Sequence, residues 1–178
     1  MDFNYIINNE DEVNNLIPAY YSFTGVVTER NNMWNNQGEV VEDMMYLTLE
    51  NEEGGIVNFV ISPDTYFLDC GIIEIGSVIT GYYRSDMPVP MIYPPRYQAR
   101  VITFEKENRN IKVDHFNEFL VSQDNMLSLQ VSNNTWVTLE NGGRYCENIG
   151  DKDLVVLYGA STRSIPAITV PFVIIVLT

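Results

Sequence analysis

The only histidine of the chain, His115, lies in the sequence VDHF and is the side chain best suited to proton transfer near neutral pH. Asp114 and a serine nucleophile would complete a hydrolytic triad, the available serines being Ser122, Ser132, Ser161 and Ser164. However, neighbours in one strand point to opposite faces, so Asp114 is poorly placed to orient His115. The sequence also has no G-x-S-x-G elbow. We therefore expect no catalytic residue, and a hydrolase built on His115 is a distant alternative.

Carboxylates gather in residues 39–43 (EVVED) and 50–55 (ENEEGG), where they could surround a hard cation. The D-x-D-x-D-G ladder of a calcium loop is absent, and acids at a hairpin tip also serve to keep a sheet edge solvated. Neither a Walker loop nor a G-x-G-x-x-G sequence is present. We expect no metal and no cofactor.

Residues 84–112 are basic in an otherwise acidic chain. Their basic side chains are Arg84, Arg96, Arg100, Lys106, Arg109 and Lys112, and four tyrosines lie near or among them: Tyr82, Tyr83, Tyr93 and Tyr97. Aromatic side chains beside basic ones are typical of proteins that bind single-stranded nucleic acid on an OB-fold. A formal net charge of -14 opposes this interpretation, so nucleic acid is an unlikely partner and this function remains the alternative.

Two proline-containing links offer the most site-like side chains. The first, MPVPMIYPPRY over residues 87–97, has four prolines, and the second, GASTRSIPA over residues 159–167, has hydroxyl groups around one arginine. The candidate binding residues are Tyr93, Arg96, Tyr97, Ser161, Thr162, Arg163 and Ser164. In the simpler alternative the hydroxyls satisfy local backbone groups and Arg163 pairs with an acid. We expect the two links to lie side by side at one end of the molecule.

The charge is unevenly distributed. Residues 1–55 contain eleven acidic residues and a single basic one, Arg30. No positive n-region opens the chain, and the longest apolar run, near the C-terminus, is far shorter than the ~20 residues of a membrane helix. Cys70 and Cys146 are far apart and in no C-x-x-C pattern, so we expect reduced thiols. These features predict a cytoplasmic protein without a membrane partner.

Hydrophobic periodicity predicts an all-β protein. The acids after Asn9 and the apolar residues before Pro18 predict one short N-terminal helix. From Tyr21 onward the period is two, with strands expected in ten stretches: residues 22–30, 43–51, 55–62, 77–84, 97–106, 110–116, 126–132, 136–141, 153–159 and 171–177. A long strand, a glycine hairpin, a crossover and two more strands follow the order of an OB-like Greek-key barrel, and another small barrel or sandwich is the alternative.

An internal repeat predicts a second such barrel. A constant shift of 70 residues matches Ser62 with Ser132, Thr65 with Thr135 and Tyr66 with Trp136. With eight more residues inserted, Gly81 meets Gly159 and Pro88 meets Pro166. The expected organisation is a lead-in over residues 1–20, a first OB-like unit over 21–106 and a shorter second unit over 107–178.

Four stretches also resemble an uncharacterised family of two-unit β-barrel proteins from Gram-positive, spore-forming anaerobes. They are VNFVISPDTYFLD, MPVPMIYPPRYQA, IKVDHFNEFLVS and LYGASTRSIPA, and the resemblance spans residues 24–178. It implies a bacterial source and a two-unit β architecture, and it carries no activity and no catalytic residue. The expected function is a non-enzymatic binding or assembly module that engages a protein or a small ligand through its proline links.

Overall fold

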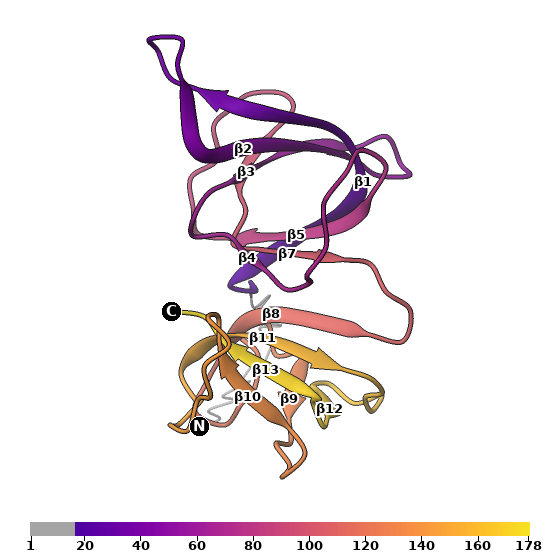
Figure 1. Cartoon of the computed structure of the whole chain (residues 1–178). Coiled ribbons are helices and arrows are strands. Elements are labelled where there is room, and N and C mark those ends of the chain that lie inside the picture. The colour runs from indigo at the N-terminus through magenta and orange to yellow at the C-terminus, as the bar shows by residue number, and fades with distance from the viewer. Residues whose placement is uncertain (1–16) are drawn as a thin grey trace, which may run out of the picture.

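A computed structural model describes residues 17–178, and its regular elements are all strands, which confirms the all-β prediction. The strands are β1 (Tyr20–Trp34), β2 (Val40–Glu50), β3 (Ile56–Ile61), β4 (Tyr66–Phe67), β5 (Val78–Arg84), β6 (Arg96–Gln98), β7 (Val101–Phe104), β8 (Asn110–Phe116), β9 (Leu127–Leu129), β10 (Trp136–Leu139), β11 (Lys152–Tyr158), β12 (Ala167–Thr169) and β13 (Val173–Val176). They form two bodies, one above the other in Figure 1. We call residues 20–104 the upper body and residues 110–178 the lower body.

The upper body is one curled sheet with the order β4-β7-β5-β1-β2-β3-β6. β1, β2 and β3 are antiparallel neighbours, β5 pairs with β1, and β6 runs parallel to β3. β6 and β7 are joined by residues 99–100 alone, so the chain passes directly from one end of this order to the strand next to its other end. Its interior holds a cluster of buried apolar side chains that includes Leu47, Leu49 and Phe59.

The lower body repeats this pairing. β10 pairs parallel with β13 as β4 does with β7, and β12 pairs parallel with β9 as β6 does with β3. β11 lies antiparallel between β13 and β8, as β5 lies between β7 and β1. Hydrogen bonds recur too: the Thr65 hydroxyl donates to the Ala99 carbonyl at 2.8 Å, and the Thr135 hydroxyl to the Pro171 carbonyl at 2.9 Å.

The shift of 70 residues is correct for β3 and β4, but two later matches are wrong. Gly81 pairs with Ile102, and the equivalent place beside Ile174 is occupied by Val156, not by Gly159. The cis bonds Tyr93–Pro94 and Ile165–Pro166 lie the same distance before β7 and β13, so Pro94 rather than Pro88 corresponds to Pro166. The sequence comparison matches glycine with glycine and proline with proline, whereas the strand pairing determines which positions of the two bodies are equivalent.

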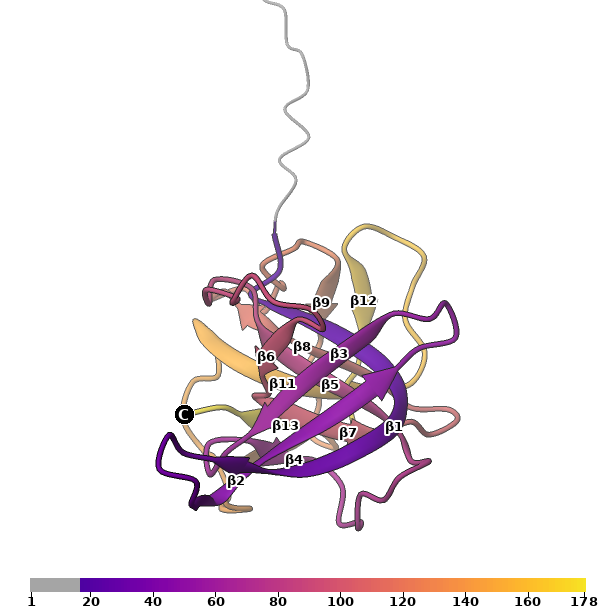
Figure 2. The same cartoon turned by 90° about the horizontal axis from the view of Figure 1, so that it is seen from above.

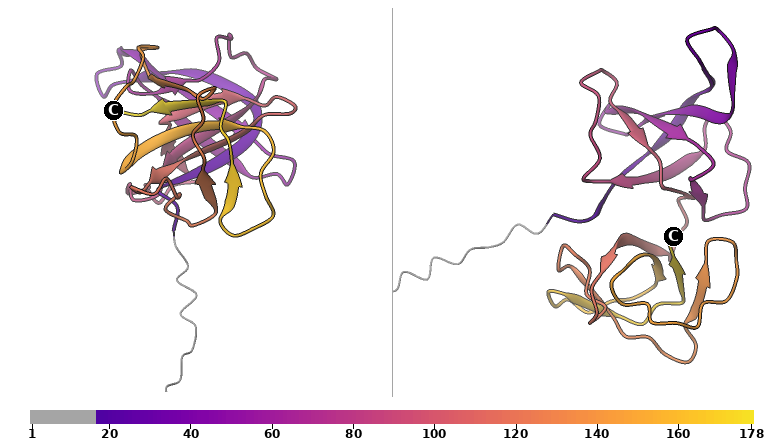
Figure 3. Two further views of the ribbon diagram at one scale, coloured as in Figure 1. Left: turned by 90° about the horizontal axis from the view of Figure 1, so that it is seen from below. Right: turned by 90° about the vertical axis from the view of Figure 1, so that its left-hand side faces the viewer.

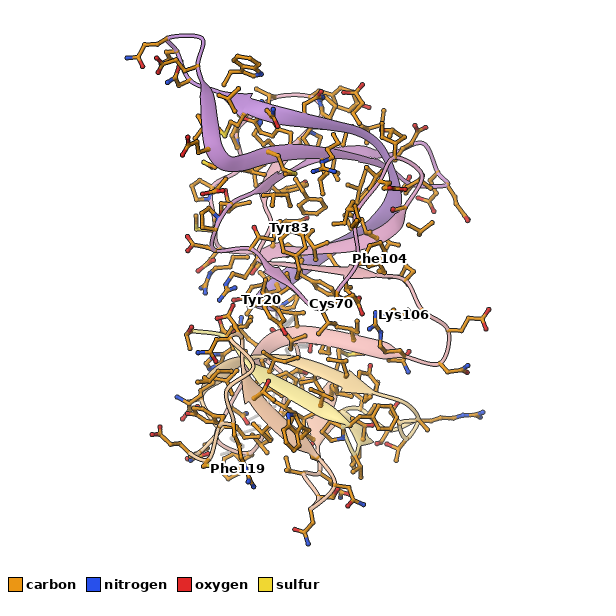
Figure 4. All side chains as sticks on the ribbon, in the orientation of Figure 1. Tyr20, Cys70, Tyr83, Phe104, Lys106 and Phe119 are labelled. Carbon is orange, nitrogen blue, oxygen red and sulfur yellow. The ribbon has the colours of Figure 1, made fainter. Side chains whose placement is uncertain are left out.

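Equivalent faces of the two sheets pack against each other. This interface is a cluster of buried apolar residues from both bodies, among them Tyr20, Val101, Val113 and Val155. Arg100 of the upper body donates two hydrogen bonds to the Glu140 carboxylate of the lower body, at 2.6 and 3.0 Å. Figure 4 shows Tyr20 at this junction, where its hydroxyl donates to Asp153.

Most expected strands are present, and the differences lie at their ends. β1 and β2 extend beyond the predicted ranges to meet at Trp34 and Val40, and the short strands β4 and β12 were not predicted. The helix expected over residues 10–17 falls almost wholly outside the described residues. Among residues 17–178, no helix is long and apolar enough to cross a membrane.

Candidate partner-binding surface

The first proline link, residues 87–97, lies mostly in the loop of residues 85–95 between β5 and β6 and displays apolar side chains to solvent. Five of its large apolar side chains are exposed: Met87, Val89, Met91, Ile92 and Tyr93. The Tyr93 side chain is 79% exposed and that of Met91 is fully exposed. Four prolines restrict the backbone here, so the apolar groups are held out rather than folded inward. Large exposed apolar patches on a folded protein mark interaction sites.

The base of this link is anchored to the upper body by aromatic contacts. Tyr97 stacks on Tyr83 with ring centroids 3.9 Å apart and an interplanar angle of 15°. Burial is the main cause that raises the pKa of the Tyr83 hydroxyl well above its usual value, and the nearby Tyr97 hydroxyl is the second cause. The Arg96 guanidinium lies 4.6 Å from the centre of the Tyr46 ring, a cation–π contact. Arg96 and Tyr97, predicted as recognition groups, therefore hold the link in place, while Tyr93 faces solvent.

The start of the link is fixed by polar contacts. Arg84 donates to both carboxylate oxygens of Asp86 at 2.8 and 2.7 Å, and the Ser85 hydroxyl donates to the Pro18 carbonyl at 2.6 Å. Beside it, Met87 lines a cleft of about 400 Å³ together with Met44 and Arg100. Both ends of the link are therefore tied down, and its middle carries the exposed apolar groups.

The second link satisfies most of its polar groups locally. The Thr162 hydroxyl accepts a hydrogen bond from the Ile168 N–H at 2.8 Å, and the Ser164 hydroxyl donates to the Pro166 carbonyl at 2.8 Å. Ser161 and Arg163 are exposed. No ion pair of residues 17–178 includes Arg163, so the expected pairing with an acid is not found there.

The structure does not bring the two links together. In the right-hand view of Figure 3 the first link is at the top of the upper body, while the second projects from the lower body. No hydrogen bond or ion pair within the described chain joins them. The bodies pack through equivalent sheet faces, which leaves equivalent loops far apart.

Most basic side chains of residues 84–112 are paired with acids. Arg84 pairs with Asp86 and Asp153, Arg100 with Glu140, Lys106 and Arg109 with Asp69, and Lys112 with Asp124. Only Arg96 of the six takes part in no ion pair among residues 17–178. These ion pairs are not evident from the sequence, apart from the pair of Arg84 with Asp86, which lie two residues apart. The basic stretch therefore presents little free positive charge.

His115 belongs to the junction between the bodies. Its Nδ1 lies 2.9 Å from Asp153 Oδ1, and Asp153 Oδ2 accepts hydrogen bonds from the Tyr20 hydroxyl at 2.7 Å and from Arg84 at 3.2 Å. Asp114 does not orient the ring, as the strand alternation predicts; its Oδ1 accepts from the Ala19 and His115 backbone N–H groups instead. No serine of residues 17–178 is hydrogen-bonded to His115, so no nucleophile is assembled there.

No group of three or more His, Cys, Asp or Glu side chains within residues 17–178 is arranged to hold a metal ion. Comparisons with family models, curated proteins and solved structures found no match to this chain. The exposed first proline link is therefore the feature of the described residues that best indicates a function.

Proposed function

We propose that this protein is a non-enzymatic binding module that engages a partner protein through the first proline link. The observation that carries the proposal is the run of exposed apolar side chains from Met87 to Tyr93 on a link tied at both ends. A stiff loop loses little conformational entropy on binding, and exposed tyrosine is among the residues that contribute most at interfaces. A convex loop suits a protein surface better than it suits a small ligand.

We further propose that each body is an OB-like unit. This is supported by the pairing of β1 with β2 and β5, by the parallel pairing of β6 with β3, and by the antiparallel pairing of β7 with β5. The repeated pairing in the lower body supports a duplication, with the two units over residues 21–106 and 107–178. In this arrangement the first proline link is the loop between the fourth and fifth strands of the first unit.

The two alternative functions have less support. Single-stranded nucleic acid would need free cationic groups, whereas five of the six basic residues over 84–112 are already paired with acids. A hydrolase would need a nucleophile at the Nε2 side of His115, and no serine of residues 17–178 is hydrogen-bonded to this ring. Cys70 and Cys146 are both free and exposed, which supports a cytoplasmic location.

The proposal is tested by affinity purification from cells that produce the protein, with three tagged forms in parallel. The wild type, the link variant Met91→Asp/Tyr93→Asp and the control Phe119→Asp are compared by quantitative mass spectrometry. Phe119 is 74% exposed and lies at the far end of the lower body (Figure 4). A partner should be lost from the link variant only, and the purified pair should bind in calorimetry. Identical recovery from all three forms would refute the proposal.

A further inference from the structure

The turn between β1 and β2 and the turn after β8 are the same structural motif. In the first, Asn35 Oδ1 accepts from the Gln37 and Glu39 N–H groups, both at 2.9 Å. In the second, Asn117 Oδ1 accepts from the Phe119 and Val121 N–H groups at 3.0 and 3.1 Å. The backbone bonds within the two turns match as well.

The two turns differ in their distance from the body that carries them. Phe116, just before the lower turn, still pairs with Lys152 of β11 and is fully buried. Trp34 holds the same place before the upper turn, yet it lies eight residues beyond Val26, the last residue of β1 that pairs with β5. Its side chain is 61% exposed. The upper turn is thus carried outward on a two-stranded ribbon, residues 31–44, which we call the arm.

The arm extends beyond the packed sheet, and only Met44 at its base lines the cleft beside Met87. β5 reaches β1 only up to Val26, and β3 reaches β2 only from Met45 onward. Figure 2 shows the arm as the indigo hairpin that extends away from the strands of the upper body. The lower body forms the same turn without such an extension, so the arm is not needed to close the turn. An isolated ribbon adds little stability by itself.

The arm carries one exposed aromatic residue and three exposed carboxylates. Trp34 is paired across the ribbon with Val40, which is also exposed. Residues 41–44 form a bulge opposite β1, in which Asp43 has a φ of 60°, and such a bulge bends the strand that contains it. Glu39, Glu42 and Asp43 are exposed and take part in no ion pair among residues 17–178. The arm contains no basic residue.

We infer that the arm is a second interaction surface, distinct from the first proline link, and that it binds a cationic peptide segment of a partner protein. The face of an indole ring attracts guanidinium and ammonium groups, and the carboxylates on the same arm can pair with other cationic groups of one segment. The net charge of -14 disfavours anionic membranes and nucleic acid on grounds of sign, and it also disfavours a second copy of this chain. An arginine- or lysine-rich segment is the complementary ligand.

The experiment measures fluorescence anisotropy of labelled eight-residue peptides of alternating Arg and Gly, Lys and Gly, or Glu and Gly. It is run with the full chain at about 0.1 M salt, where charges more than ~10 Å apart are screened. The Arg and Lys peptides should bind and the Glu peptide should not. Trp34→Ala should weaken binding about tenfold, as expected for loss of a cation–π contact and its apolar area. Phe119→Ala, in the equivalent turn, should change it less than about twofold.

Two charge variants separate local recognition from general attraction. Glu39→Gln/Glu42→Gln removes two charges from the arm, and Glu52→Gln/Glu53→Gln removes two from the exposed turn between β2 and β3. Only the arm pair should weaken peptide binding severalfold, and Met91→Asp/Tyr93→Asp should leave it unchanged. Equal losses from both charge pairs, no binding of the cationic peptides, or full affinity in Trp34→Ala would each overturn the inference. None of these results bears on the partner of the first proline link.

Discussion

Asp69 joins the upper body to the segment that leads into the lower body, and its removal tests the ion-pair reasoning most directly. Its carboxylate, 9% exposed, accepts two hydrogen bonds from Arg109 at 2.7 and 3.0 Å, and its Oδ1 pairs with Lys106 at 2.5 Å. It also accepts from the Thr103 hydroxyl and the Phe104 N–H. Asp69→Ala would leave Arg109, 16% exposed, without its carboxylate.

The expected loss follows from the exposure of each partner. Breaking a buried pair costs about 3–5 kcal/mol because the remaining charge is unpaired, and the slight exposure of Arg109 favours the lower end. Lys106 is 52% exposed, so its pairing adds at most about 1 kcal/mol. Asp69→Ala should therefore lower the free energy of unfolding by about 3–4 kcal/mol at neutral pH, measured by urea titration. The control Asp86→Ala, whose ion pair with Arg84 is solvent-exposed, should shift the midpoint little.

The pH dependence gives a second readout. Burial alone would raise the pKa of Asp69, but the hydrogen bonds from Arg109 and Lys106 outweigh it and lower this pKa below its usual range. A depressed native pKa stabilises the fold above the unfolded pKa of ~3.9, and this contribution is lost as the pH falls through the native pKa. The gap between wild type and Asp69→Ala should shrink in acid. A loss below about 1 kcal/mol at neutral pH would refute the assignment of Asp69 as a buried anchor.

Two further outcomes are expected. Burial raises the pKa of Asp114 and outweighs the opposite effects of the Ala19 N–H hydrogen bond and of Lys112. The contribution of Asp114 to stability is therefore largest at low pH and is lost as the pH rises through the native pKa. Asp114→Asn should flatten this part of the pH dependence measured by urea denaturation, and an unchanged pH dependence would contradict the assignment. Tyr97→Ala should lower the free energy of unfolding by about 2–3 kcal/mol, because the stack on Tyr83 is lost, and Tyr93→Ala should change it by no more than about 0.5 kcal/mol. Equal losses of stability from the two variants in thermal unfolding would show that Tyr93 is structural.

The candidate surface was partly predictable. The four prolines of residues 87–97 mark an irregular link in any fold, and Tyr93, a predicted binding residue, is one of its exposed side chains. Arg96 and Tyr97 were expected beside it as recognition groups, but they contact Tyr46 and Tyr83. These partners come from strands far away in the sequence, so no local pattern indicates them. The exposure of Trp34 was also hidden, because it depends on where β5 stops pairing with β1 and where β3 stops pairing with β2.

Most of the strands follow from the sequence alone, because the alternation of apolar and polar residues is a local property with a period of two. The sequence also determined the equivalence of Ser62 with Ser132 and of Thr65 with Thr135, where identical turns need identical hydroxyls. Which charged side chains form ion pairs follows only from the three-dimensional fold. Asp69 neutralises Arg109 forty residues away, and Glu140 neutralises Arg100, because strand pairing and the packing of the two bodies bring these side chains within hydrogen-bond distance. Coulomb attraction depends on distance in space, which the order of residues along the chain does not specify.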